Sequence, residues 1–294
     1  MIFSSSSIIE SNLEYVMCTP ERGISFENVN SLEYLDLHEC CVSADFLSHI
    51  PDTLKTLSLC RVVLLSSSDG VKLPVGLKKL EYRGDSHQCT LPLISNFRDL
   101  TELDYVAIKV SSSQKPERTS FEGEQTELYH VPIQSFITNL PTQIKSLFLH
   151  AECSPKRSSE GTMICRTVEV LHSFPMLQDL DFKSDCASCS FDLSLLPPLM
   201  KLKLAVSGSL IGHFPSTLRF LDFRGPIQSF EFFWKHYVMP LQHLVSFSRD
   251  NSPFPDVIDF RGLPFPKHLS YFNTYSKSVV LDSIPDSTTH FYVG

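Results

Sequence analysis

Cys186 and Cys189, in the sequence CASC, have the C-x-x-C spacing that is typical of a metal or redox site. Zinc takes four ligands in a tetrahedron, and no second C-x-x-C or H-x₃-H pair accompanies this one. A redox pair would need a thioredoxin-like strand and helix around it, which the neighbouring residues do not predict. We therefore expect two loop cysteines, with no metal and no cofactor.

The groups needed for nucleophilic catalysis are scattered along the chain. Such catalysis requires a nucleophile, a base and an orienting group within reach of one another. The eleven glycines form no phosphate-binding loop, and no G-x-S-x-G occurs. Histidines occur singly, and four fall at positions predicted to face outward from strands: His38, His150, His243 and His290. The sequence therefore predicts no catalytic residue and a protein that is not an enzyme.

What the chain repeats is an acid–apolar–base triplet after a fixed leucine spacing. LRFLDFRG (218–225) has close copies in LKKLEYRG (77–84) and VIDFRG (257–262). The underlying unit is L-x-x-L-x-L, with clear copies beginning at Leu32, Leu54, Leu77, Leu100, Ile144, Leu177, Leu199 and Leu218. Weaker copies begin at Leu13, Leu241, Leu269 and Thr288. Starts lie 22, 23 and 23 residues apart, and later 22, 19 and 23, which is typical of a repeat protein.

Each unit is expected to form one strand of a continuous parallel sheet. Alternate side chains of a strand face the same way, so the fourth and sixth positions point into the core and the third, fifth and seventh point out. A proline stands three residues before many of the units, at Pro51, Pro74, Pro141, Pro215, Pro266 and Pro285. Proline suits the start of a strand, and the short spacing leaves little room for a full helix in the return. We expect extended or 3₁₀ returns, with short helices near Ala44–His49 and Leu93–Phe97.

This pattern resembles the leucine-rich repeat, in the variety whose strand is introduced by a Pro-x-x-Leu step. Similar spacing occurs in some fungal and protist repeat proteins and in bacterial leucine-rich repeat effectors. The resemblance implies an α/β solenoid dominated by strands, a horseshoe with a parallel sheet on its concave face. The family usually places Asn or Cys three residues after the last strand leucine. Here only Cys40 fits, so the usual asparagine ladder is missing.

The repeats predict a single domain over residues 1–294, with about 11–12 repeats and polar insertions near 108–140 and 150–170. Residues 111–127 and 152–162 have compositions typical of surface loops. The segment 249–266 contains two strand-like pieces, and the sequence leaves open which of them is the repeat strand.

The outward positions carry the functional argument. In the fifth column of the clear repeats, five of eight residues are carboxylates, and the seventh column is partly basic. Such a charge lattice can simply keep a broad sheet soluble. The alternative is a concave protein-binding surface with aromatic anchors. The predicted partner-binding residues are Tyr34, Asp36, Glu81, Asp104, Phe148, Asp181, Phe220, Asp222, Arg224 and Tyr271.

Composition narrows the class of partner. The net charge of −8 argues against a general nucleic-acid binder, and no apolar run is long enough for a membrane helix. Nine cysteines, an odd number, and the absence of a signal peptide predict an intracellular protein, cytoplasmic or nuclear. We expect a non-enzymatic protein-interaction scaffold. Alternatives are the substrate-recognition component of an F-box-type ubiquitin ligase and an effector-like repeat domain of a larger protein. A bare last strand also leaves self-association open.

Overall fold

The computed structural model describes residues 31–38, 41–65, 72–85, 97–111, 137–150, 155–157, 163–184, 189–227, 229–249, 257–274, 278–282 and 284–293. The chain divides into two compact units. Unit 1 comprises Met1–Ile144 with His150–Glu152, and unit 2 comprises Lys145–Leu149 with Cys153–Gly294. The single domain predicted from the repeats stays a prediction.

Unit 1 contains a parallel sheet whose strands follow one another in chain order. These strands are β1 (Tyr34–His38), β3 (Thr56–Cys60), β5 (Lys79–Asp85) and β6 (Tyr105–Ser111). The returns between them carry the paired strands β2 (Cys41–Ser43) and β4 (Val63–Leu65), helix α1 (Ala44–Ser48) and the 3₁₀ turn η3 (Phe97–Asp99). Helix α1 confirms the expected helix near Ala44–His49. Of the expected helix at Leu93–Phe97, only Phe97 is described, and it opens η3.

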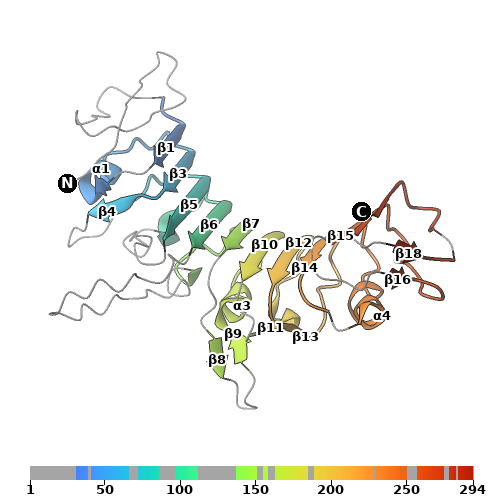
Figure 1. Ribbon diagram of the computed structural model, residues 1–294. Coiled ribbons are helices and arrows are strands. Elements are labelled where there is room, and N and C mark those ends of the chain that lie inside the picture. Colours follow the sequence, from blue (N-terminus) through green and yellow to red (C-terminus); the bar gives the residue numbers. More distant parts are fainter. Residues whose placement is uncertain are drawn as a thin grey trace. The chain divides into compact units, whose positions relative to one another are not determined.

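Unit 2 repeats this plan, and Figure 1 shows β10, β12 and β14 side by side. Its sheet contains β7 (Ser146–His150, of which His150 is assigned to unit 1), β10 (Asp179–Ser184), β12 (Lys201–Val206), β14 (Phe220–Arg224), β15 (Ser246–Arg249), β17 (Tyr271–Thr274) and β19 (His290–Val293). The strands from β10 onward are all parallel to their neighbours.

The returns of unit 2 form two further small sheets and short helices. One sheet has the order β13-β11-β9-β8, from β8 (Pro155–Arg157), β9 (Met163–Cys165), β11 (Ser190–Asp192) and β13 (Ser209–Ile211). The other pairs β16 (Val257–Asp259) with β18 (Ser278–Val280). The helical segments are α3 (Arg166–Leu171), η4 (Leu193–Leu195), α4 (Phe230–Phe233) and the π-helix η5 (Trp234–Val238). The expected strand-dominated solenoid with few short helices is therefore confirmed.

The ambiguous segment 249–266 has a clear assignment in the described residues. The repeat strand is β15, which ends at Arg249, whereas VIDFRG begins with β16 in a return. VIDFRG therefore resembles the repeat octapeptide in sequence but does not form a repeat strand. The predicted insertion 111–127 lies outside the described residues apart from Ser111. In the insertion 152–162, the described residues 155–157 form β8, which pairs antiparallel with β9.

Alternation of exposure along the strands follows the predicted pattern. In β1, Leu35 and Leu37 are fully buried while Tyr34 and Asp36 are half-buried, and β3, β7 and β10 show the same alternation. A strand buried on one face only needs apolar side chains at every second position. The L-x-L pairs of successive repeats therefore stack into one continuous core within each unit.

The Pro-x-x-Leu step forms a tight turn ahead of the strand. The carbonyl oxygens of Pro51, Pro74 and Pro215 accept a hydrogen bond from the N–H three residues later, with N···O distances of 3.0, 3.2 and 3.1 Å. Proline has no N–H to donate, but its fixed φ suits such a turn and its carbonyl remains free to accept. The proline therefore closes the turn that directs each leucine into the core.

A backbone ladder links successive repeats, although the asparagine ladder is missing. One carbonyl oxygen accepts from two consecutive N–H groups of the next repeat: Lys55 from Lys78 and Lys79, both at 2.9 Å, and Met200 from Arg219 and Phe220, at 2.8 and 3.1 Å. Hydroxyl groups reinforce the stacking, since Thr217 Oγ1 donates to the Leu199 carbonyl oxygen at 2.6 Å. These hydrogen bonds lie ahead of each strand, so they join successive repeats at the end of the strand opposite to the expected asparagine position.

The glycine of LEYRG and LDFRG follows from the size of the core residue two positions earlier. A Cβ on Gly225 would lie 2.7 Å from Phe223 Cζ and 2.9 Å from the Val206 carbonyl oxygen, and one on Gly84 would overlap the Tyr82 ring. Repeats with an aliphatic residue at the sixth position, such as Leu204, carry a larger residue at the corresponding site. Glycine therefore gives the aromatic rings of Tyr82 and Phe223 room, although Phe182 at the same position of its repeat is followed by Ser184.

Candidate functional site

The third, fifth and seventh positions of the repeat strands form one outward surface in each unit, here named the strand face. Nine of the ten predicted partner-binding residues lie on it. In unit 1 these are Tyr34, Asp36 and Glu81, and in unit 2 they are Phe148, Asp181, Phe220, Asp222, Arg224 and Tyr271. Most are half-buried, and Phe220 is 44% exposed. Whether they bind a partner stays a prediction.

Asp104 does not lie on the strand face, which corrects its predicted position. β6 begins at Tyr105, which is paired with Lys79, so Asp104 precedes the strand. The repeat register here starts at Leu103 instead of Leu100. Both leucines are fully buried and both close a turn, because the Leu100 N–H bonds to the Phe97 carbonyl and the Leu103 N–H to the Leu100 carbonyl. The extra turn duplicates the leucine spacing, and the alternation of Val106 and Ile108 was the signal that could have fixed the register.

The same three-residue shift occurs before β15. The strand begins at Ser246, paired with Phe220, so the register starts at Leu244 and not at Leu241. His243 was predicted to face outward from a strand, and it lies in the turn instead. The sixth position of this repeat is Arg249, a core position at which the side chain is 1% exposed. Burial lowers the pKa of Arg249 to about 9.

The strand face of unit 1 carries a group of interacting side chains that includes a residue missed from the sequence. Lys79 Nζ lies 2.7 Å from Glu81 Oε1 and 4.9 Å from the centre of the Tyr105 ring. The hydrogen bond to Glu81 raises the pKa of Lys79, although burial opposes it, and the charge of Glu81 adds to the rise. In the structure Tyr105 occupies the third position of this repeat, whereas the register predicted from Leu100 had placed Glu102 there. Lys79 is thereby held by a carboxylate and an aromatic ring at once.

Charged residues on the strand face of unit 2 are paired along and between strands. Lys203 Nζ lies 3.6 Å from Asp181 Oδ2, and Arg224 Nη2 lies 3.6 Å from Asp222 Oδ2. Partial burial raises the pKa of Asp181, and the nearby positive charge of Lys203 opposes that rise. These pairs are exposed enough that each contributes little to stability, about 0–1 kcal/mol. They set the pattern of charge on the surface more than they hold the fold.

Rings gather at the far end of the unit 2 strand face. Tyr271 lies 6.1 Å from His290 and 5.9 Å from Tyr292 between ring centres, and His290 lies 6.3 Å from Tyr292. Tyr292 is 52% exposed. These three side chains and Phe220 are named the aromatic patch. The positions between them on β15 and β17 are small and polar, occupied by Ser246, Ser248 and Asn273. The outward positions of these two strands carry no charged residue between the rings, because Arg249 of β15 faces the core.

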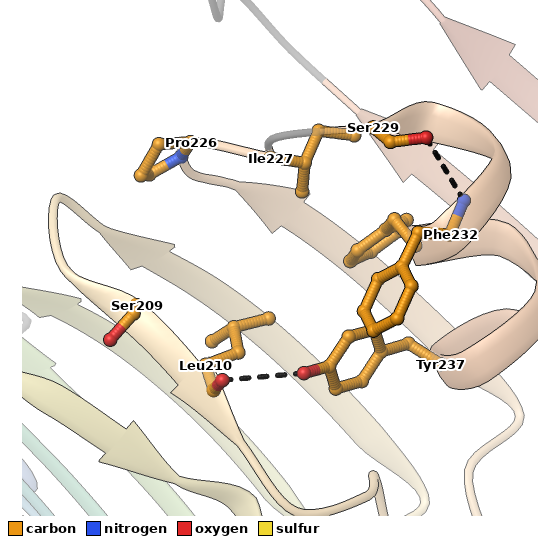
Figure 2. Close-up of a pocket in the computed structure, with 8 residues that line it drawn as sticks. Ser209, Leu210, Pro226, Ile227, Ser229, Phe232 and Tyr237 are labelled. Carbon is orange, nitrogen blue, oxygen red and sulfur yellow. Dashed lines mark hydrogen bonds between the residues drawn. The ribbon is translucent and has the colours of Figure 1, made fainter.

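A pocket of about 180 Å³ lies among the returns of unit 2. Figure 2 shows its lining from β13, the loop after β14, and the α4–η5 segment. The Tyr237 hydroxyl donates to the Leu210 carbonyl oxygen at 3.3 Å, and the Phe232 N–H donates to Ser229 Oγ at 3.3 Å. Burial raises the pKa of Tyr237. The hydroxyl groups shown are used within the fold, and the remaining lining is mostly apolar. No sequence pattern predicts this pocket, because the π-helix that supplies Tyr237 has no recognisable signature in the chain.

The potential metal-binding side chains do not assemble into a site in the part of the chain that the structure describes. No three His, Cys, Asp or Glu side chains there are arranged to hold a metal ion. Cys189 is buried, while Cys186 lies outside the described residues. Among the described helices, none combines the length and the apolar character needed to cross a membrane.

The parallel strands, the leucine core and the short returns define a solenoid of the leucine-rich repeat type. No protein-family model matches the sequence, and no curated protein matches it. A structural comparison finds the protein chain in "Crystal structure of TLR13-ssRNA13 complex", with 15% sequence identity and a TM-score of 0.35. The match covers 87% of this chain and 47% of that chain, so this chain spans about half its length. A likeness at that TM-score carries no argument about function, and the assignment to a repeat subfamily stays a prediction.

Proposed function

We propose that this protein is a non-enzymatic scaffold that binds a protein partner through its strand face, with the aromatic patch as the centre of binding. The carrying observation is the convergence of Tyr271, His290 and Tyr292 on adjacent strands β17 and β19. Tyrosine offers a large contact area at a low entropic cost, and binding energy usually concentrates in a few such side chains.

The surroundings of the patch also suit protein recognition. Serine and asparagine side chains adapt their hydrogen bonds to a partner, and Asn273 Nδ2 already donates to Ser248 Oγ at 3.4 Å. The rings stand on strands of a continuous sheet, so their positions are fixed before binding. Because little order must be gained on association, less binding energy is lost. The paired charges around Asp181 and Asp222 would then select among partners more than they add affinity.

The test is affinity capture with a double variant, Tyr271→Ala/Tyr292→Ala, and a matched control. Phe232→Ala is the control, because Phe232 is 53% exposed, close to the 52% of Tyr292, but lies among the returns. Loss of one hot-spot residue costs about 2 kcal/mol or more, which lowers affinity roughly thirtyfold. A partner captured by the wild-type protein and by Phe232→Ala should therefore be lost from the double variant. Circular dichroism would check that both variants are folded.

Equal recovery of that partner by all three proteins would refute the proposed binding face. The same capture tests the F-box alternative, since recovery of a cullin adaptor with the wild-type protein would support it. The proposal has two further parts. The nine cysteines support an intracellular location. The exposed Tyr292 and Val293 of β19 support self-association through that strand.

A further inference from the structure

Two exposed cations stand side by side at the end of the unit 1 strand face. Arg83 on β5 and Lys109 on β6 occupy the seventh position of neighbouring strands and are Cα partners in the sheet. Neighbouring strands lie about 4.8 Å apart, and like charges directly opposite one another are destabilising. Within the described part of the chain, neither side chain forms an ion pair.

At the two positions nearest to these cations, one acidic side chain is paired with another base and the other position carries no acid. Glu81, two residues before Arg83, is held by Lys79 at 2.7 Å. The corresponding fifth position of β6 is Ala107, which has no charge. In unit 2 the same arrangement is complete, because Arg224 lies 3.6 Å from Asp222 two residues earlier. Unit 1 therefore keeps a local positive charge that the equivalent place in unit 2 neutralises, in a chain whose net charge is −8.

We infer that Arg83 and Lys109 form a binding site for the carboxylates of an acidic segment in the protein partner, an inference that rests on the proposed function. The planar guanidinium of Arg83 suits bidentate contact with a carboxylate, and the Lys109 ammonium adds a second charge beside it. His38 on β1 lies in the same row and is exposed, so the segment would cross the strands.

The neighbouring charges favour carboxylates of a short peptide over a nucleic acid. Asp36 and Glu81 lie at the next outward position of the same face, so the positive region is only one row of side chains wide. A nucleic-acid site also needs a broader patch of Lys and Arg than two adjacent side chains.

The experiment measures binding of a fluorescein-labelled peptide of eight glutamates by fluorescence anisotropy, with eight glutamines as the control peptide. Arg83→Gln/Lys109→Gln removes the two unpaired cations. Lys78→Gln/Lys235→Gln is the matched control, since it removes the same charge from residues that are paired with Glu102 and Glu231. Each exposed charge contact changes affinity by about two- to fivefold, so the first variant should raise Kd by roughly 4- to 25-fold. The control variant should raise it by less than about twofold, because its cations are already neutralised.

Several outcomes would overturn the inference. An equal loss of affinity in both double variants would show general charge attraction and no site. So would the absence of binding, or tighter binding of an eight-nucleotide RNA or of a phosphoserine peptide of equal charge. If the glutamate peptide fails to bind but Tyr271→Ala/Tyr292→Ala still abolishes partner capture, only this inference falls and the proposed function stands.

Discussion

Replacing Gly225 by alanine should destabilise unit 2 because of a specific steric conflict. The new Cβ would lie 2.7 Å from Phe223 Cζ and 2.9 Å from the Val206 carbonyl oxygen, closer than unbonded atoms tolerate. Phe223 cannot turn away freely, since it is fully buried and stacks on Phe233 at 4.9 Å between ring centres. Overpacking of this kind costs about 1–3 kcal/mol. Alanine recovers about 0.4–1 kcal/mol through lower entropy of the unfolded chain. The expected net loss is therefore about 1–2 kcal/mol.

A second substitution separates the two contacts. Leucine is the residue at the equivalent position of other repeats, and Phe223→Leu would remove the far end of the ring. The conflict with the Val206 carbonyl oxygen would remain, because it involves the main chain. In the Phe223→Leu background, Gly225→Ala should therefore cost about half as much, which corresponds to a coupling energy of about 0.5–1 kcal/mol.

The assay follows the fluorescence of Trp234, the only tryptophan of the chain, during unfolding in urea and on heating. Trp234 is fully buried in unit 2, so its emission reports the unfolding of that unit. For about 150 residues, a loss of 1–2 kcal/mol lowers Tm by roughly 2–8 °C. The reasoning is refuted if Gly225→Ala leaves the free energy of unfolding unchanged. It is also refuted if the penalty is the same with Phe223 and with Leu at that position.

Two further predictions concern single polar groups of unit 2. Thr274→Val should raise the free energy of unfolding by about 1 kcal/mol. The reason is that Thr274 Oγ1 is buried without a hydrogen-bond partner among the described residues. A lower free energy of unfolding in urea would contradict this prediction. Hydrogen bonds from Arg261 lower the pKa of Asp259 to about 2. The stabilising effect of this pair should therefore be complete above the ordinary carboxyl pKa of about 4 and be lost as the pH falls toward 2. Carboxyl NMR titration should show that pKa. Arg261→Gln should raise it only part of the way toward 4, because the main-chain N–H at that position still donates to Asp259 Oδ1; an unchanged pKa in the variant would count against the pair.

The repeat spacing allowed much of the fold to be predicted from the sequence, because the burial of one strand face requires an apolar residue at every second position. Leu35 with Leu37 and Leu221 with Phe223 both follow this rule and face the core. The register failed at Leu100 and Leu241 for a physical reason. In both places a second leucine, three residues later, is equally buried, and the hydrogen bonds that separate the two turns cannot be seen in the sequence.

The candidate site was predictable only in part. The outward columns were correct wherever the register was correct, so Tyr271 and Phe220 were placed on the strand face. The group formed by Lys79, Glu81 and Tyr105 was missed, because it depends on which residue of β6 lies opposite Lys79. Among the described residues Arg83 forms no ion pair, and this could not be predicted either, since the sequence shows an acid two residues away from Arg83 and from Arg224 alike. Side-chain geometry determines which basic side chain each carboxylate pairs with.

The forked main-chain hydrogen bonds between successive repeats have a consequence for the evolution of the molecule. Because the Lys55 and Met200 carbonyl oxygens hold the next repeat through N–H groups alone, no particular side chain is required at those contacts. Mutations can therefore change the outward residues of a repeat without loosening its attachment to its neighbours. The returns can also differ in length on the same terms, as the spacing of only 19 residues between Leu199 and Leu218 shows. Selection can then diversify the recognition surface while the stacking remains constant.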